Sequence, residues 1–154
     1  YSASIDRTWP ADRFRPVLAR ATRRLPDATI VIPTMPNGDP ASQALASDTG
    51  AHVLPLTFPK VTALVATADL VISPDTAITV IASAFQVPTL AVMRKNTEQW
   101  VPYRVDGRIA FSDDPRSIQQ LPPQRVIDAL DDVIDDVGAR RGWPMVSAGA
   151  AAGR

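Results

Sequence analysis

The chain has 154 residues, 45% of them hydrophobic and 21% charged, which is enough apolar material for the core of one domain. Sixteen basic side chains balance sixteen acidic ones, so overall charge gives no support for binding nucleic acid or anionic lipid. The absence of cysteine and the single histidine exclude disulfides, thiol catalysis and a multi-histidine metal centre, and we expect neither a signal peptide nor a membrane span.

The first half of the chain predicts alternating helices and strands. Residues 1–10 resemble the end of one element and the approach to a helix. Apolar residues at helical spacing then follow at Phe14, Val17, Leu18, Ala21 and Leu25. Pro16 fits this helix only in a first turn capped by Asp12. The next predicted elements are a buried strand over 28–33, a helix from Asp39 to Gly50 and a weak strand over 53–56.

The second half continues the alternation. We expect a short helix over 59–68, a helix over 75–85, and strands over 69–73, 88–93 and 108–111. In the last helix one face is an apolar stripe formed by Val126, Ile127, Leu130, Val133, Ile134 and Val137. Residues 142–154 are predicted to be a disordered tail, so the domain covers residues 1–141.

This order predicts an α/β fold, a Rossmann-like three-layer domain with a mainly parallel sheet. Such a domain normally opens with a strand, whereas this chain begins where that strand should be ending. We therefore expect that the first strand is lacking and that the chain is a piece of a longer protein.

Ligands of an open parallel sheet bind beyond the carboxyl ends of its strands. Three predicted loops meet there: Thr34–Asp39, Ser73–Ala77 and Arg94–Trp100. In the second loop, small residues at the start of a helix leave backbone amides accessible to a phosphate or diphosphate. The alternative is that Asp75 merely caps the helix.

Three stretches in order resemble glycosyltransferase family 9, the heptosyltransferase-like enzymes. They are SASIDRTWPADRF, ADLVISPDTAITVIASAFQVPTLAV and EQWVPY, which together span about residues 2–103. The resemblance implies the C-terminal, donor-binding half of a GT-B enzyme. Asp75, Thr76 and Ala77 match the family's Asp-Ser/Thr-Gly turn, whose amides take the donor diphosphate, and Arg7 matches the basic residue that stabilises the leaving nucleotide.

Two positions depart from the family pattern. Ala77 stands where the family has glycine, and Val80 stands where it has histidine. Since valine neither donates a hydrogen bond nor carries charge, whatever that histidine does is lost here.

Other residues are further candidates at the same edge. Asp39 is a candidate for ribose but more readily a helix cap, and Arg94 and Lys95 are candidates for phosphate or sugar. Thr57 and Phe58 precede the helix where the family binds adenine, although Phe58 also suits the core, and Trp100 and Tyr103 are candidates for stacking. We assign no role to His52.

The first hypothesis is therefore donor binding by part of an inverting, metal-independent glycosyltransferase. The resemblance implies a nucleoside diphosphate sugar such as ADP-heptose, no metal and no cofactor. It also implies a glycan or glycolipid acceptor, such as lipopolysaccharide, bound through a missing N-terminal domain, and a cytoplasmic location, free or peripheral at the inner membrane face. The alternatives are a degenerate domain used for scaffolding or partner binding, and a generic phosphate-binding flavodoxin-like domain.

Overall fold

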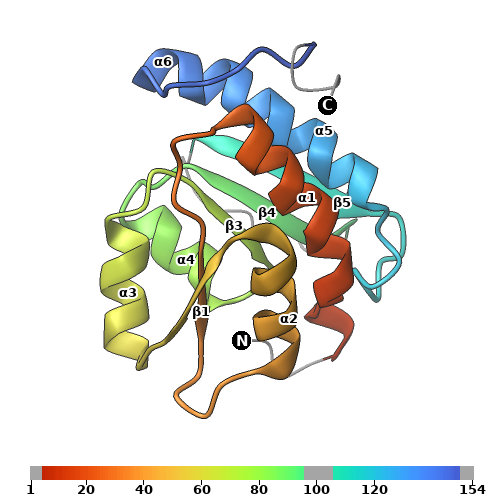
Figure 1. Cartoon of the computed structure of the whole chain (residues 1–154). Coiled ribbons are helices and arrows are strands. Elements are labelled where there is room, and N and C mark those ends of the chain that lie inside the picture. Colours follow the sequence, from red (N-terminus) through yellow and green to blue (C-terminus); the bar gives the residue numbers. More distant parts are fainter. Residues whose placement is uncertain (1–4, 96–105, 150–154) are drawn as a thin grey trace.

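The computed structural model describes residues 5–95 and 106–149, in which parallel strands alternate with helices (Figure 1). The strands are β1 (Val31–Thr34), β2 (His52–Pro55), β3 (Val71–Pro74), β4 (Thr89–Arg94) and β5 (Gly107–Ser112). The helices are the 3-10 turn η1 (Ile5–Arg7), α1 (Ala11–Arg24), α2 (Pro40–Thr49), α3 (Phe58–Ala66), α4 (Ala77–Ala84), α5 (Pro123–Val133), the π-helical turn η3 (Ile134–Gly138) and α6 (Ala139–Arg141).

The strands form two parallel sheets. β1 pairs with β2, and β4 lies between β3 and β5. Helices α1 and α5 share one apolar cluster with β4 and β5, whereas α3 and α4 share another with β3. Helices therefore cover both faces of the three-stranded sheet, and the predicted α/β fold with parallel strands is confirmed.

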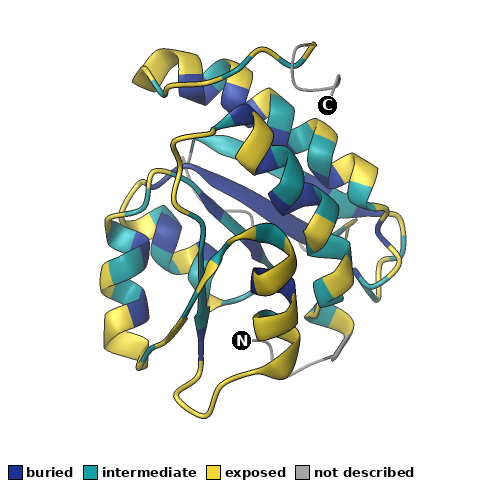
Figure 2. Ribbon diagram, viewed as in Figure 1, coloured by how far each residue is buried: buried dark blue, intermediate teal, exposed yellow. Residues whose placement is uncertain are grey.

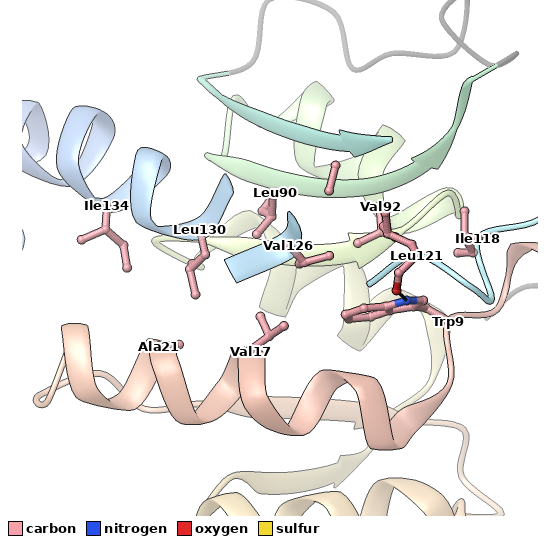
Figure 3. Close-up of a cluster of buried hydrophobic side chains, with 11 residues drawn as sticks. Trp9, Val17, Ala21, Leu90, Val92, Ile118, Leu121, Val126, Leu130 and Ile134 are labelled. Atoms are coloured by element: carbon pink, nitrogen blue, oxygen red, sulfur yellow. Dashed lines mark hydrogen bonds between the residues drawn. The ribbon is translucent and has the colours of Figure 1, made fainter. Parts of the chain in front are cut away.

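The larger core lies between α1, α5 and the three-stranded sheet (Figure 3). Val17 of α1 and Leu130 of α5 meet Leu90 and Val92 of β4 there, and all four are buried. Trp9 closes one end of this cluster, where its indole N–H donates to the carbonyl of Leu121 at 3.1 Å. The tryptophan thus joins the start of α1 to the loop before α5.

Burial differs sharply between the two sheets (Figure 2). In β4 every residue except Arg94 is buried, but β2 is mostly exposed. The predicted buried strand over 28–33 is only partly buried, since Val31, Ile32 and Pro33 of β1 all retain intermediate exposure. An apolar run therefore gave a strand in both sheets and full burial in only one.

Helix α1 differs from its predicted form at the N-terminus. Pro10 occupies the cap position in place of Asp12, and Pro16 lies inside the helix beyond its first turn. An interior proline removes one backbone hydrogen bond, here the one to the carbonyl of Asp12. The packing of Val17 and Ala21 in the larger core keeps the helix continuous past this defect.

The last helix continues from α5 through η3 and α6 and ends at Gly142, whose φ of 69° is left-handed. Residues 143–149, for which the sequence predicts a disordered tail, contact α1. The N–H of Val146 donates to the carbonyl of Arg24 at 2.8 Å, and the Arg24 side chain donates back to the carbonyl of Val146 at 2.6 Å. Arg24 is fully buried and also pairs with Asp131 and Asp135.

Candidate functional site

The turn after β3 begins α4 later than predicted. The N–H of Asp75 donates to the carbonyl of Val92 at 3.0 Å, so Asp75 still belongs to the β3–β4 ladder. Thr76 is the cap in its place, because its hydroxyl accepts from the N–H of Ile78 at 3.2 Å. The expected cap at Asp75 is therefore wrong, and a threonine directly before the helical run was the signal for the correct one.

This cap decides which amides at the start of α4 can meet a ligand. Ile78 donates to the Thr76 hydroxyl, and Thr79 donates to the Thr76 carbonyl at 3.1 Å. In the part of the chain that the structure describes, the N–H of Ala77 has no hydrogen-bond partner, and Ala77 is exposed. The positive end of the α4 dipole therefore presents an accessible donor at the carboxyl edge of the sheet.

Asp75 and Arg94 come together at the same edge. Their side chains are 3.8 Å apart at the ends of the neighbouring strands β3 and β4. Arg94 can meet a phosphate through its guanidinium, while Asp75 can accept a hydrogen bond from a hydroxyl group. Because the arginine offsets the charge of Asp75, an anion near α4 meets less repulsion than a lone carboxylate would cause.

Lys95 is engaged elsewhere. Its ammonium lies 3.1 Å from Asp113, and Asp113 also pairs with Arg125 at 2.6 Å. The hydrogen bond from Arg125, followed by that from Lys95, lowers the pKa of the exposed Asp113 carboxyl. A phosphate would have to compete with this carboxylate for Lys95.

Arg7 lies in η1, which is held against the loop before α5. The carbonyl of Asp6 accepts from the N–H of Ile118 at 3.0 Å. Among the described residues, no hydrogen bond or ion pair joins Arg7 to the turn over 73–77. The structure therefore brings Asp75 and Arg94 together, but it does not join Arg7 to them.

Asp39 acts as the predicted cap of α2. Its carboxylate accepts from the N–H groups of Ala41 at 3.3 Å and Ser42 at 3.1 Å, and from the Ser42 hydroxyl. The hydroxyl of Ser42 is the main cause that lowers the pKa of Asp39, and the two backbone amides add to it. These contacts already use much of the acceptor capacity of the carboxylate.

None of the contacts described above involves Thr57, Phe58 or His52. Thr57 is the cap residue of α3 without a side-chain cap hydrogen bond. Phe58 is 60% exposed, so the alternative that it belongs to the core is wrong. His52 lies exposed in β2. Trp100 and Tyr103 fall outside the described residues. Within residues 5–95 and 106–149, acidic and histidine side chains form no group of three that could hold a metal ion.

Comparison with known proteins identifies the family. The sequence pattern of glycosyltransferase family 9 (heptosyltransferase) matches residues 2–121. The chain belongs to glycosyltransferase family 9. A comparison with curated proteins finds no match. In the described residues, no helix is both long and apolar enough to cross a bilayer.

Solved structures share the fold of this family 9 chain. The Escherichia coli heptosyltransferase WaaC with ADP superposes with a TM-score of 0.70 at 19% identity, over 86% of this chain and 42% of that one. The family 9 glycosyltransferase from Veillonella parvula superposes with a TM-score of 0.73 at 17% identity, over 88% and 44%. The E. coli ADP-heptose lps heptosyltransferase II gives 0.67 at 16%, also over 88% and 44%. The chain thus spans less than half the length of each of these proteins.

Proposed function

We propose that this family 9 domain binds the diphosphate of a nucleoside diphosphate sugar at the carboxyl edge of β3 and β4. The observation that carries the proposal is the start of α4, where Ala77, an exposed residue whose amide pairs with no described group, lies within the stretch that matches the family. The amide supplies one donor, and Arg94 supplies a cation on the neighbouring strand. Asp75 would then accept from a hydroxyl of the ribose or sugar.

WaaC, solved with ADP, supports adenosine diphosphate as the first ligand to test. WaaC has also been solved with ADP-2-deoxy-2-fluoro heptose, which makes ADP-heptose the first sugar donor to consider. The proposal keeps three further roles. Asp39 would bind the ribose, Lys95 would contact the phosphate or sugar, and Arg7 would stabilise the leaving nucleotide. Transfer would be inverting and metal-independent, with the base that activates the acceptor in a separate N-terminal domain. The acceptor would be lipopolysaccharide or another surface glycan, and the location cytoplasmic.

Calorimetric titration of the chain with ADP tests this proposal through one backbone group. Ala77→Pro removes the exposed N–H at the first position of α4, where proline is well tolerated. The preceding Thr76 already has the extended backbone that proline requires, with φ of −139° and ψ of 174°. Ala77→Gly is the matched control, because it changes the same side chain and keeps the N–H.

Loss of a hydrogen bond to a charged group corresponds to roughly 1.5–3 kcal/mol, so Ala77→Pro should weaken ADP binding by about tenfold to a hundredfold. Ala77→Gly should bind nearly as the parent does, and Arg94→Ala should weaken binding to a similar extent as Ala77→Pro. Equal affinity of the proline variant and the parent would contradict the assignment of the diphosphate to α4.

A specific observation favours partner binding as a second candidate. Val80, at the position of the family histidine, is 63% exposed, so the substitution does not serve the core. Phe85 at the end of α4 is exposed as well. If a folded chain binds no nucleoside diphosphate but self-associates or captures a partner through α4, and Val80→Asp abolishes this, the second function replaces the first.

A further inference from the structure

After α6 the chain turns back on itself, and residues 143–149 form a strap over the last helix and the end of α1 (Figure 1). The N–H of Trp143 donates to the carbonyl of Gly138 in η3 at 2.9 Å. Val146 bonds to Arg24 through both of its backbone groups. Its N–H donates to the Arg24 carbonyl at 2.8 Å, and its carbonyl accepts from the Arg24 Nε–H at 2.6 Å. The strap is therefore held at two points by its own main chain.

The strap occupies a seat formed by the last turn of α1 together with α5 and η3. Arg24 is fully buried in this seat, where its guanidinium also pairs with Asp131 of α5 and Asp135 of η3. Gly138 of η3 leaves space for an aromatic ring, because a methyl group on it would lie 2.8 Å from a ring carbon of Trp143. The seat thus fits one extended segment of polypeptide that carries an aromatic side chain near the residue bonded to Arg24.

Occupation of the seat is favourable for a reason that does not depend on which chain supplies the segment. The carbonyl of Arg24 ends α1 and has no partner inside the helix, so the N–H of Val146 satisfies it. The Nε–H of Arg24 belongs to a charged donor, and hydrogen bonds from charged donors are about twice as strong as neutral ones. Both bonds are made by the main chain of the strap, which is the same in every copy.

The hydrophobic core does not depend on the strap. Among the described residues, neither apolar cluster includes any part of residues 143–149. Pro144, Met145 and Ser147 of the strap are exposed. The strap can therefore leave the seat by local opening, while α1 and α5 stay packed on the sheet.

Gly142 is the hinge between the last helix and the strap. Its φ of 69° is left-handed, a backbone conformation that glycine adopts without the cost that a side chain would bring. A methyl group added to it would meet no atom within 4 Å. A larger residue at this position would therefore strain the turn through its backbone alone, without touching the seat.

We infer that the strap is exchangeable: the seat accepts residues 143–149 of a second copy of this chain, and a dimer forms by mutual exchange about Gly142. The exchanged dimer keeps the contacts between strap and seat that the closed chain makes, so only the hinge has to change conformation. For a strap joined to its own seat by a short linker, the effective concentration is on the order of 1 mM, so the closed monomer prevails in dilute solution. Straining the closed turn shifts the balance to the dimer.

Sedimentation equilibrium of the 154-residue chain and its variants, over a range of protein concentrations, tests the exchange. Gly142→Val strains the closed turn, because a β-branched residue disfavours left-handed backbone but readily adopts an extended hinge. The strain should favour opening by about tenfold per chain, so the dissociation constant of the dimer should fall by about a hundredfold. Gly149→Val is the matched control and should behave as the parent does, since a methyl group there also meets no atom within 4 Å and its φ is not left-handed.

A second substitution in the Gly142→Val chain locates the contact. Val146→Pro removes the N–H that the Arg24 carbonyl accepts and should abolish the dimer. Ser147→Ala, at the next and exposed residue, should leave the dimer intact. Hydrogen exchange at the Val146 amide should stay slow in the Gly142→Val dimer, because its partner is then the same carbonyl in the second copy.

Three results overturn the inference. A Gly142→Val chain that stays monomeric at all concentrations would show that the seat accepts no strap from a second copy. A dimer that survives Val146→Pro would depend on another contact, and a dimer that Val80→Asp removes would be the association through α4. The seat and the strap contain no residue of the site at α4, so ADP binding and strap exchange can fail independently.

Discussion

The two-stranded sheet and the three-stranded sheet bury similar strand sequences to very different extents. β4 has a neighbour on each edge and helices over both faces, and five of its six residues are buried. β1 is also an apolar run, but it pairs on one edge only, and three of its four residues remain half-exposed. An apolar pattern therefore predicts where a strand forms, while its neighbours decide how much of it leaves water.

The largest expected effect is the difference in stability lost when a leucine is truncated in β4 or in β2. Leu90→Ala in β4 removes a fully buried side chain from the larger core and should lower the free energy of unfolding by about 2–5 kcal/mol. Leu54→Ala in β2, where the leucine is 38% exposed, should cost less than about 1 kcal/mol. Urea denaturation measures both, and equal losses would show that the two-stranded part is as tightly packed as the other.

Gly107 tests how closely β5 packs against β4. A methyl group added at Gly107 would lie 2.0 Å from the carbonyl oxygen of Thr89, which pairs with it across the two strands. Gly107→Ala should therefore push β5 from β4 and cost about 1–3 kcal/mol by overpacking. Gly149→Ala is the control, because a methyl group there meets no atom within 4 Å. If Gly107→Ala left the free energy of unfolding unchanged in the same urea measurement, β5 would have to shift away from β4 at little cost.

Two arginines of α1 form ion pairs with different helices, one with α5 and the other with α2. Arg24 is buried and pairs with Asp131 of α5, whereas Arg15 forms an ion pair with Asp48 of α2 that is about half exposed. Arg24→Met should lower the free energy of unfolding by about 1–3 kcal/mol, since the carbonyl of Val146 and the partly buried carboxylate of Asp131 each lose a hydrogen bond from the buried guanidinium, while Arg20 still pairs with Asp131. Arg15→Met should change it by less than about 1 kcal/mol, because exposed pairs contribute little.

Thermal denaturation of both arginine variants checks this difference. Hydrogen exchange at Val146, which donates to the Arg24 carbonyl, reports whether residues 143–149 stay against α1. Unchanged exchange at Val146 in Arg24→Met would show that the backbone bond suffices without the side chain.

The smallest expected effect is the loss of the Asp39 cap of α2, and its size should depend on pH. Asp39→Ala should cost about 1 kcal/mol at pH 7, measured by urea denaturation, because two amides at the start of α2 lose their acceptor. Folding lowers the pKa of Asp39 below its ordinary value of 3.8. Its contribution is therefore complete above that value and is lost as the pH falls through the folded pKa, so the cost should shrink towards pH 3.

Thr76→Ala is the matched control in the three-stranded part. Its hydroxyl caps α4 without a charge, so its cost of about 1 kcal/mol should be the same at pH 7 and pH 3. If the cost of Asp39→Ala did not change with pH either, the Asp39 carboxylate would cap α2 equally well when protonated.

Local signals in the sequence determined the fold class and several helix ends. Asp39 and Pro40 start α2, Gly50 ends it with a left-handed φ of 71°, and the apolar stripe marks α5. These features depend on residues within one or two turns of each other, which a sequence displays directly. The resemblance to glycosyltransferase family 9 was visible for the same reason, since it rests on short ordered stretches of sequence.

Tertiary structure alone decided what depends on residues far apart in the chain. Asp75 belongs to the sheet instead of capping α4 because its amide pairs with the carbonyl of Val92, and no local rule displays that bond. Pro16 is accommodated inside α1 by packing against α5, and Arg94 meets Asp75 only because β3 and β4 are neighbours. Pairing and burial are set by which surfaces meet in space, and the free energy of those contacts outweighs local preference wherever the two disagree.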